Sequence, residues 1–366
     1  MAGSVFGKHF TISTWGESHG KGVGVVIDGC PAGLPLSEAD IQEYLDRRKP
    51  GQSQYTTSRT EGDRAEILSG VFEGKTTGTP ISILVANTSQ RSQDYSEIAS
   101  YYRPGHADYT FDMKYGFRDY RGGGRSSGRE TIGRVAAGAV AAKILKELGI
   151  RVCAYTRSIG PVEIEDKQFD PAEIPNNSFY MPDKAAAERA AIYTAQCMEE
   201  KDSTGGVVEC VVDGMPAGVG EPCFEKLDAN LAKAILSIGA VKGFEIGSGF
   251  GAAKLRGKQN NDVFVNHGKG IEKETNHAGG TLGGISDGSQ IVIRAAVKPT
   301  SSIAAQQHTV NQKGENIQIS VKGRHDPVIV PRAVVVVEAM TALTLVDALF
   351  EGMSARMDQV RKIWGR

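Results

Sequence analysis

The sequence contains few cysteines, and their spacing argues against a disulfide framework or a zinc site. The five are Cys30, Cys153, Cys197, Cys210 and Cys223. Their number is odd and no two of them form a CxxC pair, so reduced thiols are expected. We therefore expect no metal site.

Long apolar runs are also lacking. No stretch of about 18 apolar residues occurs, and the first ten residues, MAGSVFGKHF, contain no apolar core of the kind found in signal peptides. We expect neither a membrane span nor a secretory signal, and we expect a cytoplasmic location.

Aromatic residues are scarce, at 7% of the chain, and neither sign of charge dominates. Lys plus Arg is 42 and Asp plus Glu is 43, which gives a net charge of −1. A nucleic-acid-binding protein is the main non-enzymatic alternative, because arginines gather between residues 118 and 134. The balanced charge and the shortage of rings for base stacking argue against it, so no nucleic-acid partner is expected.

Strand-like and helix-like patterns alternate along the chain without an obvious linker. Apolar patterning predicts strands over residues 23–28, 67–72, 80–86, 207–213 and 290–297. Helical spacing of apolar residues predicts helices over residues 131–148, 183–200 and 228–238, and from about residue 331 onward. This order favours one α/β domain over residues 1–366, with sheets and helices in layers.

Two segments of the sequence resemble each other. Residues 24–33 and residues 208–218 each run from a strand pattern through Asp-Gly-x-Pro-Ala-Gly towards a helix pattern. The match indicates either two similar strand-turn-helix connections or a duplicated unit related by a pseudo-twofold axis. Both interpretations remain open on the sequence alone.

The segment most informative about chemistry covers residues 118–131, RDYRGGGRSSGRET. Its run of three consecutive glycines lets the backbone approach a ligand closely, and the segment leads into the N-terminus of a predicted helix, where free N–H groups favour anions. Hydroxyl and guanidinium donors suited to phosphate and carboxylate lie along it or just after it: Arg125, Ser126, Ser127, Arg129 and Arg134. We therefore predict an anion-binding site here.

Two histidines occur in polar turns. Residues 14–20, TWGESHG, contain the spacing of a hydrolase nucleophile elbow, but a strand pattern follows where that motif requires a helix. The turn presents Ser18 and His19 either to a ligand or merely to solvent. His106 lies in residues 103–108, RPGHAD, and is either a proton-transfer group or an exposed loop histidine.

Four further segments are candidates for contacts with anions. Arg48 lies at the end of a helix that is predicted to begin at Ser37, where a cation suits either the helix dipole or a phosphate clamp. Residues 276–284 form a second glycine-rich loop, and residues 298–302 place a lysine beside three hydroxyls. Arg324 and Asp326 either pair with each other or line a charged site. Together these segments predict two anionic ligands, a phosphorylated carboxylate and a nucleotide-like cofactor.

These segments resemble motifs of the chorismate synthase family, in the family's order and over nearly the whole chain. The matching ranges are 16–20, 53–57, 90–95, 103–108, 121–127, 276–280, 298–302 and 323–327. The resemblance implies a layered β-α-β sandwich and a homotetramer. It also implies that 5-enolpyruvylshikimate 3-phosphate is converted to chorismate and phosphate by an anti-1,4-elimination. That reaction requires reduced FMN, with no net redox change.

The resemblance also implies roles for individual residues. His19 would be the acid near the departing phosphate, His106 would lie near the flavin ring, and Asp326 would assist proton removal at flavin N5. The implied substrate-binding residues are Ser18, Arg48, Arg129, Arg134 and Arg324. The implied FMN-binding residues are Arg125, Ser126, Ser127, Gly239, Ala240, Gly283, Lys298, Pro299, Thr300, Ser301, Ser302 and Arg324.

The chain departs from the family pattern at two positions. Gln54 stands where many relatives have an arginine credited with substrate or NADPH contact, and Gly239 replaces a common asparagine. Some members of the family reduce their flavin with NADPH, whereas others depend on an external flavin reductase. We see no extra domain in the sequence and therefore expect this chain to depend on an external flavin reductase.

Overall fold

The structure is a computed structural model that describes residues 3–53, 55–56, 61–88, 97–266, 268, 270–321 and 326–365. Its first half forms a five-stranded sheet in which all neighbouring strands are antiparallel. In spatial order the strands are β1 (Val5–Phe6), β2 (Thr11–Gly16), β3 (Gly22–Asp28), β7 (Ile81–Ala86) and β4 (Ala65–Ser69).

The second half forms another antiparallel five-stranded sheet. In spatial order its strands are β11 (Val241–Ile246), β16 (Ile291–Val297), β10 (Gly206–Asp213), β8 (Arg151–Ile159) and β9 (Val162–Glu163). Strand β3 alternates buried and less buried residues only weakly, because most of its side chains are covered. The β-branched residues that predicted these strands suit such a pleated, buried surface.

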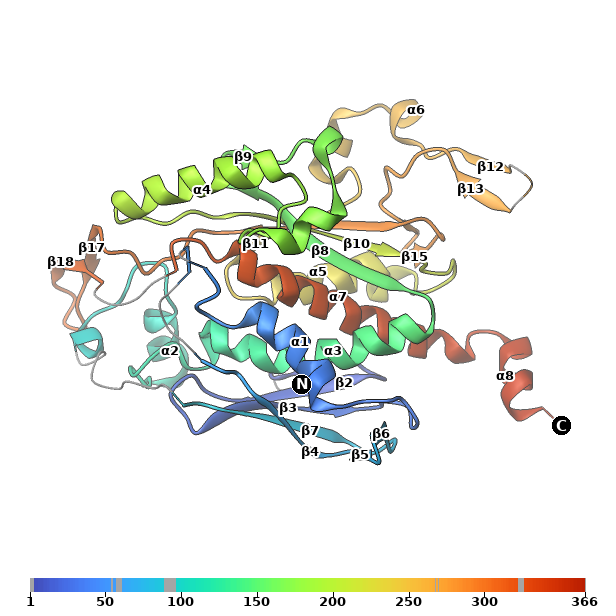
Figure 1. Cartoon of the computed structure of the whole chain (residues 1–366), viewed down its shortest axis with the longest axis horizontal. Helices are drawn as coiled ribbons and strands as arrows, with labels where there is room; N and C mark the ends of the chain where they lie inside the picture. Colours follow the sequence, from blue (N-terminus) through green and yellow to red (C-terminus); the bar gives the residue numbers. More distant parts are fainter. Residues whose placement is uncertain are drawn as a thin grey trace.

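Four helices lie between the two sheets (Figure 1). They are α1 (Glu38–Arg48), α3 (Thr131–Glu147), α5 (Leu227–Leu236) and α7 (Val330–Glu351). Helix α3 packs on β3, α7 packs on β8 and β10, and α3 and α7 pack against each other. One large cluster of buried apolar residues therefore includes side chains from both sheets and from all four helices. The predicted mixture of helices and sheets is confirmed.

Helix α7 is apolar on all sides. The stretch Val330–Ser354 is long enough and apolar enough to cross a membrane, but 83% of its most apolar 18 residues is buried inside the protein. A helix that is hydrophobic all round and covered by two sheets is a core helix. Its length and composition are therefore explained by its position between the layers.

Shorter elements surround these layers. Helix α4 (Lys184–Glu199) lies on the outer side of the second sheet, and α8 (Met357–Trp364) extends from the body (Figure 1). The other helices are α2 (Asp108–Tyr115) and α6 (Gly257–Asn260). The hairpins are β5 (Val71–Phe72) with β6 (Lys75–Thr76), β12 (Phe264–Asn266) with β13 (Ile271–Lys273), β14 (Thr281–Leu282) with β15 (Ile285–Ser286), and β17 (Gln306–Val310) with β18 (Asn316–Ser320).

The prediction of one strand over residues 67–72 is wrong. Strand β4 ends at Ser69, and Val71–Phe72 belongs to the separate β5–β6 hairpin. Gly70 lies between them with φ +80°, and a Cβ at this position would come within 2.7 Å of Pro80 O. A turn that requires a left-handed glycine therefore interrupts a continuous apolar pattern.

Helices α3 and α7 approach each other closely at Gly138. A Cβ added to Gly138 would lie 2.3 Å from Ala339 Cβ and 2.6 Å from Ala339 Cα. The neighbour is backbone in a buried helix, so it cannot swing aside as the end of a flexible side chain can. The absence of a side chain at Gly138 therefore sets how closely the two central helices pack.

We expect Gly138→Ala to lower the free energy of unfolding by about 1–3 kcal/mol, the usual cost of overpacking a core. Alanine has a higher helix propensity than glycine, which favours the substitution by up to about 1 kcal/mol. A lower free energy of unfolding would therefore show that the packing cost outweighs the gain in helix propensity. Urea unfolding measures the change. Gly352→Ala is the control, because no atom lies within 4 Å of its added Cβ. Equal stability of wild type and Gly138→Ala would contradict the packing argument.

Candidate functional site

The glycine-rich loop forms two 3-10 turns that lead into α3. They are η3 (Gly124–Ser126) and η4 (Gly128–Glu130). Ser126 Oγ donates to Gly123 O at 2.6 Å, and Ser127 Oγ accepts from Arg129 N at 3.3 Å. The two hydroxyls therefore shape the loop itself, while the loop delivers Arg129 to the start of α3.

Ser18 and His19 lie in a turn between strands β2 and β3. Strand-turn-strand geometry confirms that this GxSxG spacing is not a nucleophile elbow. Ser18 Oγ lies 3.1 Å from His19 Nδ1, and Ser18 is buried. A Cβ at Gly122 would meet His19 Nδ1 at 2.3 Å, so the glycine lets the imidazole lie directly against the loop.

Asn87 ties this turn to Arg129. Its Nδ2 donates to Glu17 O at 2.9 Å and to Gly20 O at 2.8 Å, on either side of Ser18 and His19. Its Oδ1 accepts from Arg129 Nε at 2.9 Å. One amide therefore joins the histidine turn to the guanidinium that the loop delivers.

Arg129 has acceptors for only part of its guanidinium. Nη1 donates to Asp63 Oδ1 at 3.1 Å and also to the Glu61 carboxylate. Nη2 is buried and has no hydrogen-bond partner among the described residues. A buried, unpaired N–H of a cation is costly, and an anionic ligand would satisfy it.

Arg48 lies deeper and is almost completely satisfied by the protein. Its side chain is 2% exposed. Nη1 donates to Asp63 Oδ2 at 2.6 Å, Nη2 to Gly128 O at 3.1 Å and Nε to Thr131 Oγ1 at 3.2 Å. Burial, followed by the nearby Arg332 charge, lowers the pKa of Arg48. In this arrangement each nitrogen of the Arg48 guanidinium donates to the protein, and the substrate contact that the resemblance implies stays a prediction.

Asp326 lies next to the same group of residues. Arg332 Nη1 donates to Asp326 Oδ2 at 2.6 Å, and Arg332 Nε donates to Arg48 O at 3.2 Å. Arg332 therefore connects Asp326 to Arg48. Arg324 and Gln54 lie outside the described residues, as do residues 90–95 of the sequence motifs.

Arg125 fastens the glycine-rich loop to the first sheet. Its Nη2 donates to Thr14 Oγ1 at 2.6 Å and to Thr14 O at 3.1 Å, and its Nη1 donates to Gly16 O at 3.1 Å. Its guanidinium is thus directed at β2, which leads to the Ser18–His19 turn. In this arrangement Arg125 positions the loop.

Arg134 connects α3 with the end of α5. Its Nε donates to Glu130 Oε2 at 2.8 Å, and its Nη1 donates to Ser237 Oγ at 2.6 Å. Gly239 and Ala240 lie two and three residues after Ser237, and Ala240 has the unusual φ of +71°. The structure therefore places the predicted residues 239 and 240 near the start of α3.

His106 belongs to a second group of predicted residues. Its Nδ1 lies 3.0 Å from Pro104 O, and its Nε2 lies 2.7 Å from Ser302 Oγ. A carbonyl oxygen can only accept, so Nδ1 carries a proton. In the neutral ring, Nε2 then accepts from the Ser302 hydroxyl.

The segment at residues 298–302 wraps around the backbone before His106. Lys298 Nζ donates to Gly105 O at 3.2 Å, and Ser301 Oγ donates to the same oxygen at 3.0 Å. Lys298 N donates to Ala240 O at 2.9 Å. Lysine, hydroxyls and the 239–240 turn therefore come together at His106.

A short connection joins the two groups. Ser203 Oγ donates to Thr300 O at 2.7 Å, and Thr204 N donates to Pro327 O at 2.9 Å. Pro327 follows Asp326, so residues 203–204 bridge the 298–302 segment and the Asp326 segment. Thr300 Oγ1 is another buried polar atom without a partner among the described residues.

Gly283 is the predicted residue that the chain does not bring to these groups. It lies in the β14–β15 turn, and the next residue, Gly284, accepts from Leu227 N at 2.8 Å, at the start of α5. Gly239 follows the opposite end of that ten-residue helix, which is about 15 Å long. Gly283 and Gly239 therefore cannot line the same small pocket within one chain.

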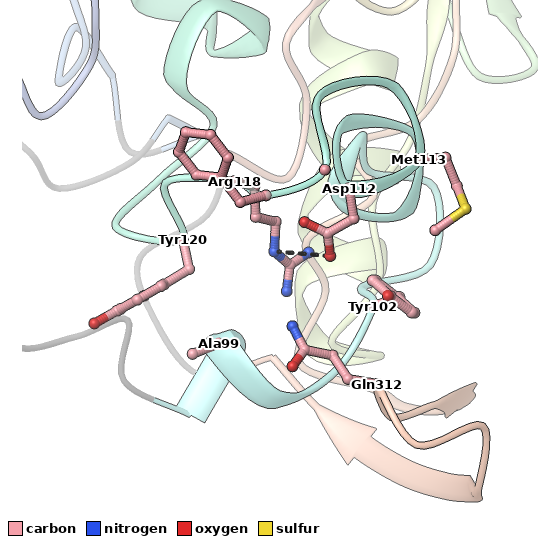
Figure 2. Close-up of a pocket in the computed structure, with 9 residues that line it drawn as sticks. Ala99, Tyr102, Asp112, Met113, Arg118, Tyr120 and Gln312 are labelled. Carbon is pink, nitrogen blue, oxygen red and sulfur yellow. Dashed lines mark ion pairs between the residues drawn. The ribbon is translucent and has the colours of Figure 1, made fainter.

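A cavity of about 380 Å³ lies beside the His106 segment (Figure 2). Tyr102, Phe117 and Arg118 are among its lining residues. Arg118 Nη1 lies 3.3 Å from Asp108 Oδ1, and Arg118 Cζ lies 5.3 Å from the centre of the Tyr102 ring. Arg118 and Tyr120 belong to the predicted anion-binding segment, but none of the substrate-binding, FMN-binding or catalytic residues that the resemblance implies lines this cavity.

Comparisons with known proteins agree along the whole chain. The model of the family described as chorismate synthase matches residues 10–350. The chain belongs to the chorismate synthase family. It is 70% identical to the chorismate synthase of Lachnospira eligens over 100% of both chains, and 67% identical to that of Agathobacter rectalis over 98% of both. A crystal structure of a chorismate synthase superposes with a TM-score of 0.76 at 35% identity, over 98% of this chain and 96% of that one.

Four residues that contact the predicted site residues were not singled out from the sequence. They are Glu61, Asp63, Asn87 and Arg332. Two carboxylates interleaved with arginines at residues 59–64, RTEGDR, were the available signal for Glu61 and Asp63. Asn87 and Arg332 carry no local signal, because their partners are distant in the sequence.

Burial lowers the pKa of His106, and the neighbouring Arg103 charge acts in the same direction. An unfolded chain with a histidine pKa near 6.5 binds the proton first as the pH falls. Folding stability should therefore decrease as the pH falls below about 6.5. We expect the His106 ring to titrate below 6.5 by NMR. His106→Asn should lose less stability than wild type between pH 7.5 and 5.5, and an equal loss in both proteins would contradict the shift.

Proposed function

We propose that the chain converts 5-enolpyruvylshikimate 3-phosphate to chorismate and phosphate with reduced FMN and no net redox change. The observation that carries the proposal is one continuous set of contacts. It runs from the Ser18–His19 turn through Asn87, Arg129, Asp63, Arg48 and Arg332 to Asp326. Three arginines, a histidine and two carboxylates in this one set of contacts suit a substrate with a phosphate and carboxylates.

The donor groups near His106 fit the phosphate of FMN. Lys298 supplies a cation, Ser301 supplies a hydroxyl, and the buried Thr300 Oγ1 lacks a partner among the described residues. Reduced flavin, when bound, supplies electron density as the allylic phosphate departs and takes up the hydrogen lost from C6. We assign Lys298 to Ser302 and the 239–240 turn to flavin binding.

The protein's own groups then hold anions and move protons. Arg129 and Arg134 bind the substrate's anionic groups, Arg129 through its unpaired Nη2. His19 delivers a proton to the departing phosphate. His106, neutral at pH 7 because its pKa is lowered by burial, presents Nε2 as a proton acceptor beside the flavin. Asp326, whose carboxylate is held by Arg332, would serve as a proton acceptor when the reduced flavin is bound.

Family membership supports three further assignments. We infer a homotetramer, a cytoplasmic location and a flavin kept reduced by an external reductase, with NADPH as the ultimate donor. Gly283, which lies about a helix length from Gly239, could contact FMN only from a different chain or at a different end of the ligand. The tetramer supplies such a neighbouring chain.

We also propose that the chain is one catalytic domain with an internal duplication, arranged as a β-α-β sandwich. The central strand orders β2-β3-β7-β4 and β8-β10-β16-β11 correspond, and a helix follows the equivalent strands of each set. Thr76 Oγ1 donates to Pro31 O at 2.6 Å, and Ser286 Oγ donates to Pro216 O at the same distance. The two similar sequence segments therefore make equivalent turn contacts, which supports the pseudo-twofold interpretation.

An anaerobic assay tests the proposed chemistry. The protein is mixed with 5-enolpyruvylshikimate 3-phosphate and reduced FMN, and both phosphate and chorismate are measured. We expect equal amounts of the two products and no consumption of reduced flavin. Formation of chorismate with oxidised FMN alone would refute the flavin requirement.

We expect His106→Ala to fold normally and to lower turnover by roughly a hundredfold or more, as loss of a proton-transfer group does. Circular dichroism and single-turnover chorismate formation measure the two effects. Tyr109→Ala is the control, since Tyr109 is exposed on the same short segment. Near-normal turnover of His106→Ala would remove this histidine from the mechanism.

A further inference from the structure

One carboxylate joins two buried guanidiniums at the centre of the site. Asp63 Oδ2 accepts from Arg48 Nη1 at 2.6 Å, and Asp63 Oδ1 accepts from Arg129 Nη1 at 3.1 Å. The Asp63 side chain is fully buried, and those of Arg48 and Arg129 are 2% and 10% exposed. Two like charges at such depth repel strongly unless an anion lies between them.

The position of Asp63 is fixed by its own backbone as well as by its charge. Its φ of +40° is unusual for a residue with a side chain, so local contacts must hold it. Gln42 Nε2 lies 3.4 Å from Asp63 O, and Gln42 Oε1 accepts from Ala65 N at 3.1 Å. Gln42 and Arg48 belong to the same helix, so α1 holds both ends of the Arg48–Asp63 pair.

Glu61 differs from Asp63 although both contact Arg129 Nη1. No hydrogen bond between Glu61 and Arg48 occurs among the described residues, and Glu61 is 10% exposed where Asp63 is fully buried. Arg129 still has its buried Nη2 unpaired. An incoming anion can therefore take the position next to Arg129 by displacing Glu61, while Asp63 stays behind the guanidinium.

We propose that Asp63 is the positioning residue that aligns Arg48 and Arg129 for the substrate's anionic group, and that Glu61 is an internal carboxylate with which that group competes. Asp63 acts through Arg129 and does not touch the substrate. This inference rests on the proposed function of the site. It assigns opposite effects to two acidic residues that lie two positions apart and contact the same nitrogen.

The test compares Asp63→Asn with Glu61→Gln, since each removes one negative charge beside Arg129. Loss of alignment weakens substrate binding in the ground state and transition state alike, which raises KM without lowering kcat. For Asp63→Asn we expect the KM for 5-enolpyruvylshikimate 3-phosphate to rise about tenfold or more, with kcat within about threefold of wild type. Its Kd for FMN, measured by flavin fluorescence, should stay within about twofold, which separates misalignment from general damage.

For Glu61→Gln we expect an unchanged or lower KM, because the competing carboxylate is gone. An equal rise of KM in both variants would overturn the proposal, because it would show a general effect of charge. An unchanged KM in Asp63→Asn would also overturn it.

If Asp63→Asn does not fold, Gln42→Ala tests the same alignment without removing the charge. We expect its KM to rise about threefold or more with kcat unchanged, since the Asp63 backbone loses its contact to α1. Gln290→Ala, at an exposed glutamine that bonds to Asp213, is the matched control and should leave KM unchanged. Equal KM values for Gln42→Ala and this control would count against the proposal.

Failure of the proposed function gives a different result. A wild-type chain that releases no phosphate with reduced FMN would refute the function itself. An active wild type whose KM is insensitive to Asp63→Asn would refute only the role assigned to Asp63.

Discussion

The close packing of α3 on α7 is the constraint on which the other features depend. Gly138 lets the two helices approach until a single added Cβ would overlap Ala339. Each helix packs on a different sheet, so their separation sets the distance between the layers. Both helices also begin at the site: Arg129 precedes α3, and Arg332 lies in the first turn of α7. Packing in the core therefore determines where the charged groups meet.

Charge balance is the second organising feature. The cluster of arginines predicted from the sequence would be unstable if its members faced only one another. The structure supplies a carboxylate for each of several cations, including Glu130 for Arg134 and Asp326 for Arg332. Buried cations need such partners, and removing one partner leaves an uncompensated charge. The charges of the site are therefore largely neutralised in advance, and Arg129 Nη2 and Thr300 Oγ1 are among the buried polar atoms without a partner in the described part of the chain.

Patterns that act over a few residues predicted the secondary structure well. The strands at 23–28, 80–86 and 207–213 and the helix at 131–148 match β3, β7, β10 and α3 closely, because periodic burial shows directly in the sequence. Hydrogen-bond partners could not be predicted in the same way. Asn87 is 42 residues from Arg129, and Arg332 is 284 residues from Arg48. The residues that neighbour Asn87 and Arg332 in the sequence do not indicate these distant partners.

The sequence by itself determined the mixture of helices and strands, the glycine-rich anion loop and the family, because each depends on local residue order or on long motifs. Tertiary structure decided which of the predicted arginines still has an N–H to offer. Arg48 and Arg125 donate to the protein itself, whereas Arg129 keeps a buried nitrogen unpaired among the described residues. Such a difference depends on which acceptors surround each guanidinium. Those acceptors come from distant segments that only the packing of two sheets on shared helices brings together.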